Sequence, residues 1–131
     1  MPCQLLSVIE SPRHPNFTAM YQRLGIEQEI ATSIRKALKL VKKAPPDILV
    51  AEFIYGYGNN YAGVNISNLD VLLIALQRHQ KETRVILFAD KSEIDQAPRL
   101  KKIHPLYTVL KLPINPTEFE KTLEEIISCQ K

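Results

Sequence analysis

Two short runs of residues, Ile48 to Phe53 and Arg84 to Ala89, are apolar at almost every position. A strand that is apolar on both faces belongs in the buried middle of a parallel sheet, because helices cover both faces of such a sheet. Weaker strand candidates lie at Leu5 to Ile9, Ile26 to Ala31 and Tyr107 to Leu112. The pattern therefore predicts five strands.

The segments between these strands carry helical periodicity. Apolar side chains recur at i, i+3, i+4 and i+7 from Phe17 and again from Ile34, which is the pattern of one buried helix face. Asn16 can cap the first of these helices, and Thr32 or Ser33 can cap the second.

Three further helices are predicted after the later strands. Ser67 and Asp70 form a variant of the capping box in front of a run of leucines. A short apolar period begins at Ile94, although Pro98 weakens a helix there. Asn115, followed by proline and then by glutamate two residues further on, is a strong helix start.

This alternation of strands and helices predicts one α/β domain over residues 1–131, without an output domain. The expected fold is a flavodoxin-like (βα)5 three-layer sandwich, in which the parallel strands follow the order 2-1-3-4-5. Ligands of such folds bind at the carboxyl ends of the strands, so candidate functional residues are sought there.

Composition and charge exclude several functional classes. The chain has 131 residues, a net charge of +3 and two cysteines, which lie near its opposite ends. The mild charge argues against nucleic-acid binding, no apolar run is long enough for a membrane span, and the cysteines match no metal or redox motif. We therefore expect a cytoplasmic monomer or weak homodimer without metal or cofactor.

Three segments resemble the receiver domain of two-component response regulators. They are residues 37–52, which end in Pro46-Asp-Ile-Leu-Val-Ala-Glu52; residues 84–89; and Leu112-Pro-Ile-Asn-Pro-Thr-Glu-Phe119. The resemblance covers essentially the whole chain, and its third segment is the most specific. It implies a role in a signalling pathway and a cis peptide bond before Pro113.

The resemblance also implies the positions of a phosphorylation site. A receiver uses an acidic pair and an aspartate to hold Mg²⁺, the same aspartate to attack a phosphoryl group, and a lysine to neutralise charge. A threonine or serine then contacts the phosphoryl group. The corresponding positions here hold Glu10 with Ser11, Glu52, Leu112 with Lys111 one place early, and Phe88.

These departures predict a stand-alone pseudo-receiver that is not phosphorylated and acts by protein–protein contact. Glutamate is longer than aspartate, and one or two carboxylates form a poor Mg²⁺ site. Glu52 has other interpretations: a partly solvated residue paired with Lys91 or Lys111, a mimic of a phosphorylated aspartate, or an unorthodox phosphoacceptor.

A loop rich in glycine, asparagine and tyrosine follows the third strand. Tyr55, Tyr57 and Tyr61 in this loop are typical of a recognition surface. The loop does not have the spacing of a dinucleotide-binding turn. The alternative function is therefore a flavodoxin-like protein that binds a small ligand or cofactor with residues 55–65.

The resemblance places a protein-binding face on the fourth helix, the fifth strand and the fifth helix. In this chain the region holds Arg99, Lys101, Lys102, His104 and Tyr107. Its basic character suits an acidic protein partner. We expect this face to be static, because the Phe88 ring cannot be drawn toward a phosphoryl group and should hold the neighbouring aromatic of the fifth strand in place.

Overall fold

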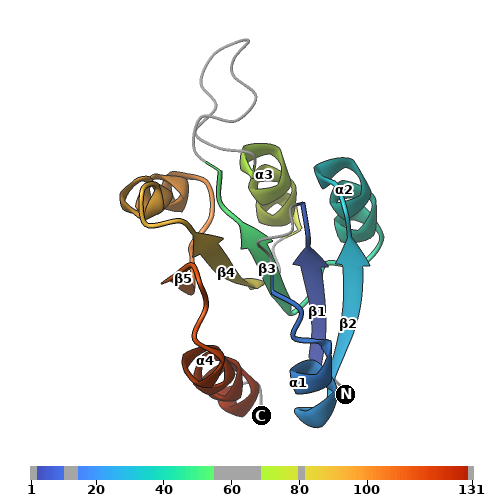
Figure 1. Ribbon diagram of the computed structural model, residues 1–131. Coiled ribbons are helices and arrows are strands. Elements are labelled where there is room, and N and C mark those ends of the chain that lie inside the picture. Colours follow the sequence, from blue (N-terminus) through green and yellow to red (C-terminus); the bar gives the residue numbers. More distant parts are fainter. Residues whose placement is uncertain (1–2, 11–14, 55–68, 80–81, 130–131) are drawn as a thin grey trace.

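The computed structural model describes residues 3–10, 15–54, 69–79 and 82–129. Five parallel strands form one sheet with the order β2-β1-β3-β4-β5, which confirms the predicted flavodoxin-like topology (Figure 1). The strands are β1 (Cys3–Val8), β2 (Ile26–Ala31), β3 (Ile48–Glu52), β4 (Arg84–Ala89) and β5 (Thr108–Lys111). The two runs that are apolar at almost every position form β3 and β4, which are both inner strands.

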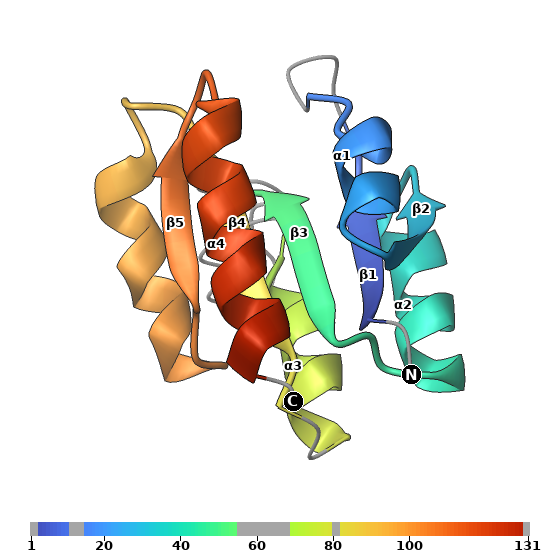
Figure 2. The ribbon, with the colours of Figure 1, turned by 90° about the horizontal axis from the view of Figure 1, so that it is seen from below.

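Helices cover both faces of the sheet. The helices are α1 (Thr18–Arg23), α2 (Ile34–Lys43), α3 (Asp70–Arg78), the 3-10 helix η1 (Ile94–Lys102) and α4 (Pro116–Cys129). Helices α1 and α4 lie on one face, and α2, α3 and η1 lie on the other (Figures 1 and 2). No helix in the described part of the chain is long and apolar enough to cross a membrane.

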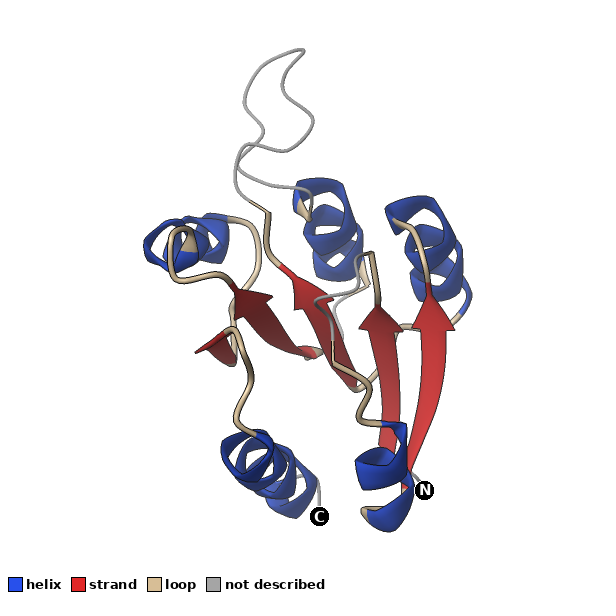
Figure 3. Ribbon diagram, in the orientation of Figure 1, coloured by secondary structure: helices blue, strands red, loops and turns tan. Residues whose placement is uncertain are grey.

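The sheet and the helices on its two faces form the three layers seen in Figure 3. An apolar core lies on each face of the sheet. Successive side chains of a strand point to opposite faces. In β3, Ile48 and Val50 therefore pack in the cluster beneath α1 and α4, whereas Leu49 and Ala51 pack in the cluster beneath α2, α3 and η1. Both faces of β3 are buried, as its sequence predicts.

Capping side chains start two helices where the sequence predicts. The Ser33 Oγ accepts a hydrogen bond of 3.2 Å from the N–H of Lys36 at the start of α2. At the start of α4, the Asn115 Oδ1 accepts from the N–H groups of Thr117 at 2.9 Å and Glu118 at 3.2 Å. These contacts satisfy backbone donors that have no partner within the helix.

The other three helices differ from the prediction. Helix α1 begins at Thr18 with Phe17 as its N-cap, so the predicted cap residue Asn16 lies one place early, although its Oδ1 accepts a hydrogen bond from the N–H of Thr18 at 3.0 Å. Ser67 lies outside the described residues, and α3 begins at Asp70 with Leu69 as its N-cap, so the predicted capping box is wrong in its register. The segment after Ile94 is a 3-10 helix and not an α-helix. Pro98 within it has no N–H to donate, and its ring interferes with the wider α-helical turn.

Candidate functional site

Glu52 is the last residue of β3 and lies at the carboxyl edge of the sheet, where the strand arrows of Figure 1 end. Its side chain is 0 % exposed. By alternation along β3 it faces the layer of α1 and α4, as Val50 does. The expectation of a partly solvated carboxylate is wrong: Glu52 ends an inner strand, between β1 and β4, and its side chain is fully buried.

Phe88 of β4 lies directly opposite Glu52 in the register of the sheet. Its side chain is also fully buried, and its ring packs edge-on against Phe119 of α4, with 5.3 Å between the ring centroids. The expected contact with the aromatic of the fifth strand is wrong. The register places Leu110 opposite Phe88, whereas Tyr107 precedes β5 and donates its N–H to the carbonyl of Val85.

Lys111, at the end of β5, does not lie on the same face of the sheet as Glu52. Lys111 is exposed and lies opposite Ala89, whose side chain belongs to the core beneath α2, α3 and η1. Lys111 therefore projects to the face opposite Glu52. Leu112 packs instead against the core beneath α1 and α4, and the peptide bond between Leu112 and Pro113 is cis, as the resemblance implies.

The acidic position after β1 is only partly described. Glu10 is partly exposed and follows Ile9, whose N–H donates to the carbonyl of Ala31 at 2.8 Å. Ser11 lies outside the described residues, as does the predicted recognition loop with its three tyrosines. Over the described ranges, no three histidine, cysteine, aspartate or glutamate side chains gather in a group that could hold a metal ion.

Another carboxylate at this edge, Asp90, organises the turn after β4. Its Oδ2 accepts hydrogen bonds from the N–H of Ser92 at 3.0 Å and from the Ser92 hydroxyl at 2.6 Å. Its carbonyl accepts from the N–H groups of Glu93 and Ile94, each at 2.9 Å. Asp90 thus connects the carboxyl end of β4 to the start of η1.

The predicted partner face follows the β5 edge of the sheet, formed by η1, β5 and α4 (Figure 2). Arg99, Lys101 and Lys102 are exposed on η1. Tyr107 is 37 % exposed, and its hydroxyl donates to the Glu125 carboxylate of α4 at 2.9 Å. Three exposed cations thus lie on η1, whereas the Tyr107 side chain is hydrogen-bonded to α4 on the other side of this edge.

A chain of polar side chains between α1 and the sheet has no counterpart among the predicted site residues. The Thr18 hydroxyl donates to Oε1 of Gln28, and Nε2 of Gln28 donates to the buried Ser7 hydroxyl at 2.9 Å. Burial raises the pKa of Tyr21, which a hydrogen bond with Ser7 partly offsets. The polar residue Ser7 within an apolar strand is the sequence signal that could have indicated this network.

The environment of His104 also differs from the expectation. It was expected on the basic surface, but it is only 5 % exposed. The residues after η1 turn back toward the start of β5, and this turn brings the imidazole inside. The burial of His104 differs from that of its neighbours Lys102 and Pro105, which are exposed.

The sequence matches no protein-family model and none of the curated proteins. Solved structures do match. A response regulator receiver domain protein from Clostridium thermocellum has a TM-score of 0.73 at 14% identity, over 98% of this chain and 96% of that one. The chemotaxis response regulator CheY4 of Vibrio cholerae has a TM-score of 0.70 at 22% identity, over 96% and 99% of the two chains.

A third similar structure is the N-terminal domain of an uncharacterized protein from Wolinella succinogenes. Its TM-score is 0.74 at 17% identity, and the match covers 98% of this chain and 96% of that domain. Identities this low establish the architecture alone. The chain therefore has the fold of response-regulator receiver domains.

Proposed function

We propose that this protein is a pseudo-receiver: a receiver-like domain of the cytoplasm that binds another protein in a two-component-like signalling pathway and is not phosphorylated. The receiver fold supports the signalling role. The observation that carries the proposal is the complete burial of Glu52, the residue at the phosphoacceptor position, opposite an equally buried Phe88.

Burial of Glu52 opposes phosphoryl transfer. A phosphoacceptor carboxylate must meet a phosphodonor and a metal ion, and both are charged and strongly hydrated. The Glu52 side chain is fully covered, so the sheet edge would have to open before either could reach it. A buried carboxylate of this kind favours a structural role over a role as a reactive phosphoacceptor.

Among the described residues, the positions that correspond to the lysine and the hydroxyl of a receiver hold apolar side chains, Leu112 and Phe88. Phosphoryl transfer needs cations aimed at the oxygens on which charge develops. Lys111 projects to the opposite face of the sheet, and Leu112 presents apolar atoms on the face of Glu52. The site therefore offers a phosphoryl group neither the lysine nor the hydroxyl that a receiver provides.

The fixed position of Phe88 supports a surface that does not switch. In a phosphorylated receiver, the residue at this position moves toward the phosphoryl group. Phe88 has no hydrogen-bonding group, and its ring is packed against Phe119. The partner face is thus proposed to hold one arrangement, in which Arg99, Lys101 and Lys102 attract an acidic protein surface.

The proposal is tested by incubation of the full chain with acetyl phosphate and Mg²⁺, followed by intact-mass measurement. We expect no gain of a phosphoryl group in the wild type or in Glu52→Gln. A receiver domain that acetyl phosphate is known to phosphorylate serves as the positive control. A mass gain in the wild type that Glu52→Gln abolishes would identify Glu52 as a phosphoacceptor and overturn the proposal.

We also predict that Glu10, Ser11 and Glu52 do not bind Mg²⁺ at physiological concentration. Magnesium prefers octahedral oxygen ligands and gives up its water reluctantly, and the one carboxylate at the end of β3 is buried. Isothermal calorimetry of the wild type and Glu52→Ala should give the same flat titration. Sub-millimolar binding that disappears in the variant would contradict this prediction.

A further inference from the structure

A surface groove with a volume of about 360 Å³ lies between helix α3 and the 3-10 helix η1, which cover the same face of the sheet (Figures 1 and 2). Its walls come from the second half of α3 and from the end of η1 with the residue that follows it. The lining residues are Ile74, Gln77, Arg78, Lys102 and Ile103. None of the candidate phosphorylation-site residues lines it, so the groove is a separate feature of the molecule.

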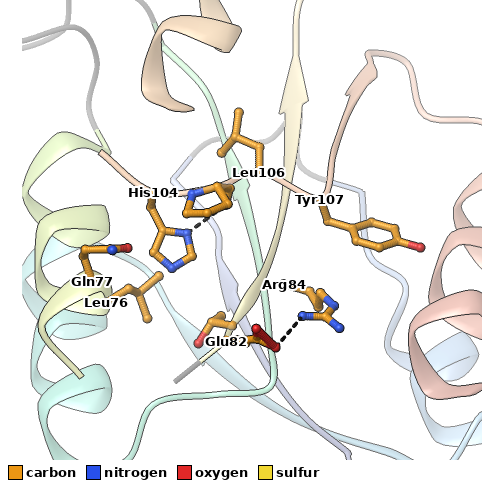
Figure 4. A pocket seen from close by; sticks show the side chains of 9 residues that line it. Leu76, Gln77, Glu82, Arg84, His104, Leu106 and Tyr107 are labelled. Carbon is orange, nitrogen blue, oxygen red and sulfur yellow. Dashed lines mark hydrogen bonds and ion pairs between the residues drawn. The ribbon is translucent and has the colours of Figure 1, made fainter. Parts of the chain in front are cut away.

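A larger pocket of about 460 Å³ at the amino end of the sheet shares Gln77 with this groove (Figure 4). By alternation along β4, Arg84 of this pocket points to the face of α1 and α4, as Ile86 does. Leu76 and Leu106 pack instead in the core beneath α2, α3 and η1. The walls of the pocket thus belong to both faces of the sheet, whereas the residues that line the groove lie on one face.

Exposed apolar side chains run along α3 into the groove. Ile74 is 44% exposed, and Val71, which lies one helical turn before it, is 55% exposed. Residues three apart lie on the same side of a helix, so these two side chains form one apolar stripe. Ile103 is partly buried and lines the same groove from the side of η1. Apolar side chains that are grouped on a surface, and not scattered, mark sites of protein contact.

Two cations border these apolar side chains. Arg78, one turn after Ile74 on α3, and Lys102 of η1 are both exposed and both line the groove. Neither cation forms an ion pair with another described residue. No acidic side chain is among the described residues that line the groove. Carboxylates of a partner can therefore pair with both cations without displacing an internal partner, whereas a basic partner is repelled.

The walls of the groove favour a helix over an extended segment as its occupant. An extended peptide binds by adding backbone hydrogen bonds to the edge of a sheet, and a groove between two helices offers no such edge. A helix pairs its own backbone groups and presents apolar side chains along one face.

We propose that the groove binds an acidic amphipathic helix of another protein, whose apolar side chains pack on Val71, Ile74 and Ile103. Carboxylates beside that apolar face pair with Arg78 and Lys102. An exposed ion pair contributes little affinity, so the apolar contact holds the helix and the charges select an acidic one. This rests on the proposed function, in which the protein acts by binding another protein, and it specifies the shape and charge of that partner.

The test is titration of a synthetic peptide into the ¹⁵N-labelled full chain, followed by amide chemical shifts. The peptide has blocked ends, is about 16 residues long and consists of leucine, alanine, glutamine and glutamate, with the leucines on one helical face. We expect saturable shifts centred on residues 71–78 and 99–103, with a dissociation constant below about 1 mM.

Two control peptides separate charge from amphipathicity. One has lysine in place of glutamate, and the other has the original composition with its leucines spread over all faces of the helix. Each should bind about fivefold more weakly or worse. Equal affinities for the three peptides, or shifts elsewhere in the chain, would overturn the proposal.

Variants of the groove complete the experiment. Ile74→Glu should weaken binding of the acidic peptide about tenfold or more, whereas Ile30→Glu, at a 52% exposed position of the edge strand β2, should not change it. Lys102→Glu should weaken binding of the acidic peptide and strengthen that of the lysine peptide. Lys42→Glu on the exposed side of α2 should change neither by more than about twofold. If Ile74→Glu does not fold, the Lys102→Glu comparison still decides the proposal.

Two further outcomes would overturn the proposal. If none of the peptides binds, the groove is not a docking site for an acidic helix, and the mass measurement with acetyl phosphate, which does not involve the groove, still tests the pseudo-receiver function independently. If the shifts of residues 71–78 and 99–103 depend on protein concentration without peptide, a second copy of the chain occupies the groove.

Discussion

Phe119 is the residue on which the aromatic side chains beneath α1 and α4 converge. Its ring centroid lies 4.9 Å from that of Phe17, 5.3 Å from that of Phe88 and 6.1 Å from that of Tyr21. Tilted and edge-on pairs at such distances contribute about 1 kcal/mol beyond their burial. The Phe88 ring thus packs against a ring of α4.

We predict a measurable coupling between Phe88 and Phe119. Phe88→Leu and Phe119→Leu should each lower the free energy of unfolding by about 1 kcal/mol, and the double variant should lose about 1 kcal/mol less than the sum. Urea denaturation of the four proteins gives this value. Phe88→Leu combined with Val41→Ala, on the opposite face of the sheet, is the additive control. Additivity of the Phe88 and Phe119 changes would contradict the prediction.

The raised pKa of Tyr21 predicts how the free energy of unfolding depends on pH in the alkaline range. Burial raises the pKa of its hydroxyl in the folded state, and the hydrogen bond with Ser7 only partly offsets this. The Tyr21 hydroxyl ionises near pH 10 in the unfolded chain and at higher pH in the folded chain. The contribution of Tyr21 to the free energy of unfolding is therefore complete below about pH 10 and decreases as the pH rises further.

Urea denaturation between about pH 9 and pH 11 tests this dependence. The free energy of unfolding should fall more steeply with pH in the wild type than in Tyr21→Phe. A Tyr21→Phe slope equal to that of the wild type would show that Tyr21 ionises alike in both states.

At the scale of secondary structure, the helix starts depend on single capping side chains. Asn115 accepts from two backbone N–H groups of α4, whereas Ser33 accepts from one N–H of α2 at 3.2 Å. Helix α4 supplies Phe119, Leu123 and Ile126 to the core beneath α1 and α4. Loss of the α4 cap should therefore destabilise the protein more than loss of the α2 cap.

We predict that Asn115→Ala lowers the free energy of unfolding by about 1 to 2 kcal/mol, and that Ser33→Ala lowers it by about 1 kcal/mol or less. Both side chains are at helix ends, so little apolar burial is lost in either variant. Chemical denaturation compares the two directly. A larger effect of Ser33→Ala would show that the number of capped N–H groups does not decide the loss.

At the scale of the whole molecule, the sheet separates two ends with different chemistry. The carboxyl end holds the buried side chains of Glu52 and Phe88, and the amino end has a pocket lined by Leu76, His104 and Leu106 among other residues. Along the β5 edge, η1, β5 and α4 connect the two ends (Figure 2). Phe88, opposite Glu52 and packed against Phe119 of α4, connects the carboxyl end to this edge.

We therefore predict that beryllofluoride, which mimics an acyl phosphate, leaves the partner face unchanged. Amide chemical shifts of residues 98–111 in the ¹⁵N-labelled chain should be the same with and without beryllofluoride and Mg²⁺. Shifts in this segment that are absent in Glu52→Gln would show that the switch operates. They would also show that the Phe88 ring moves despite its packing against Phe119.

Local chemistry in the sequence was sufficient to predict most of the architecture. The apolar runs indicate β3 and β4, the residues Ser33 and Asn115 mark two helix starts, and the alternation of elements predicts the strand order. These features depend on neighbours within about one helical turn or a few strand residues. The substitutions at the candidate site are likewise visible in the sequence alone.

The tertiary structure decided what surrounds each of those residues. Glu52 is fully buried at the end of the inner strand β3, opposite Phe88, and Phe88 packs against Phe119 from a distant helix. His104 is buried by a turn that no local pattern marks, and the pocket forms only where three separate segments meet. Burial and partnership depend on residues far apart in the chain, so periodicity and capping rules do not determine them.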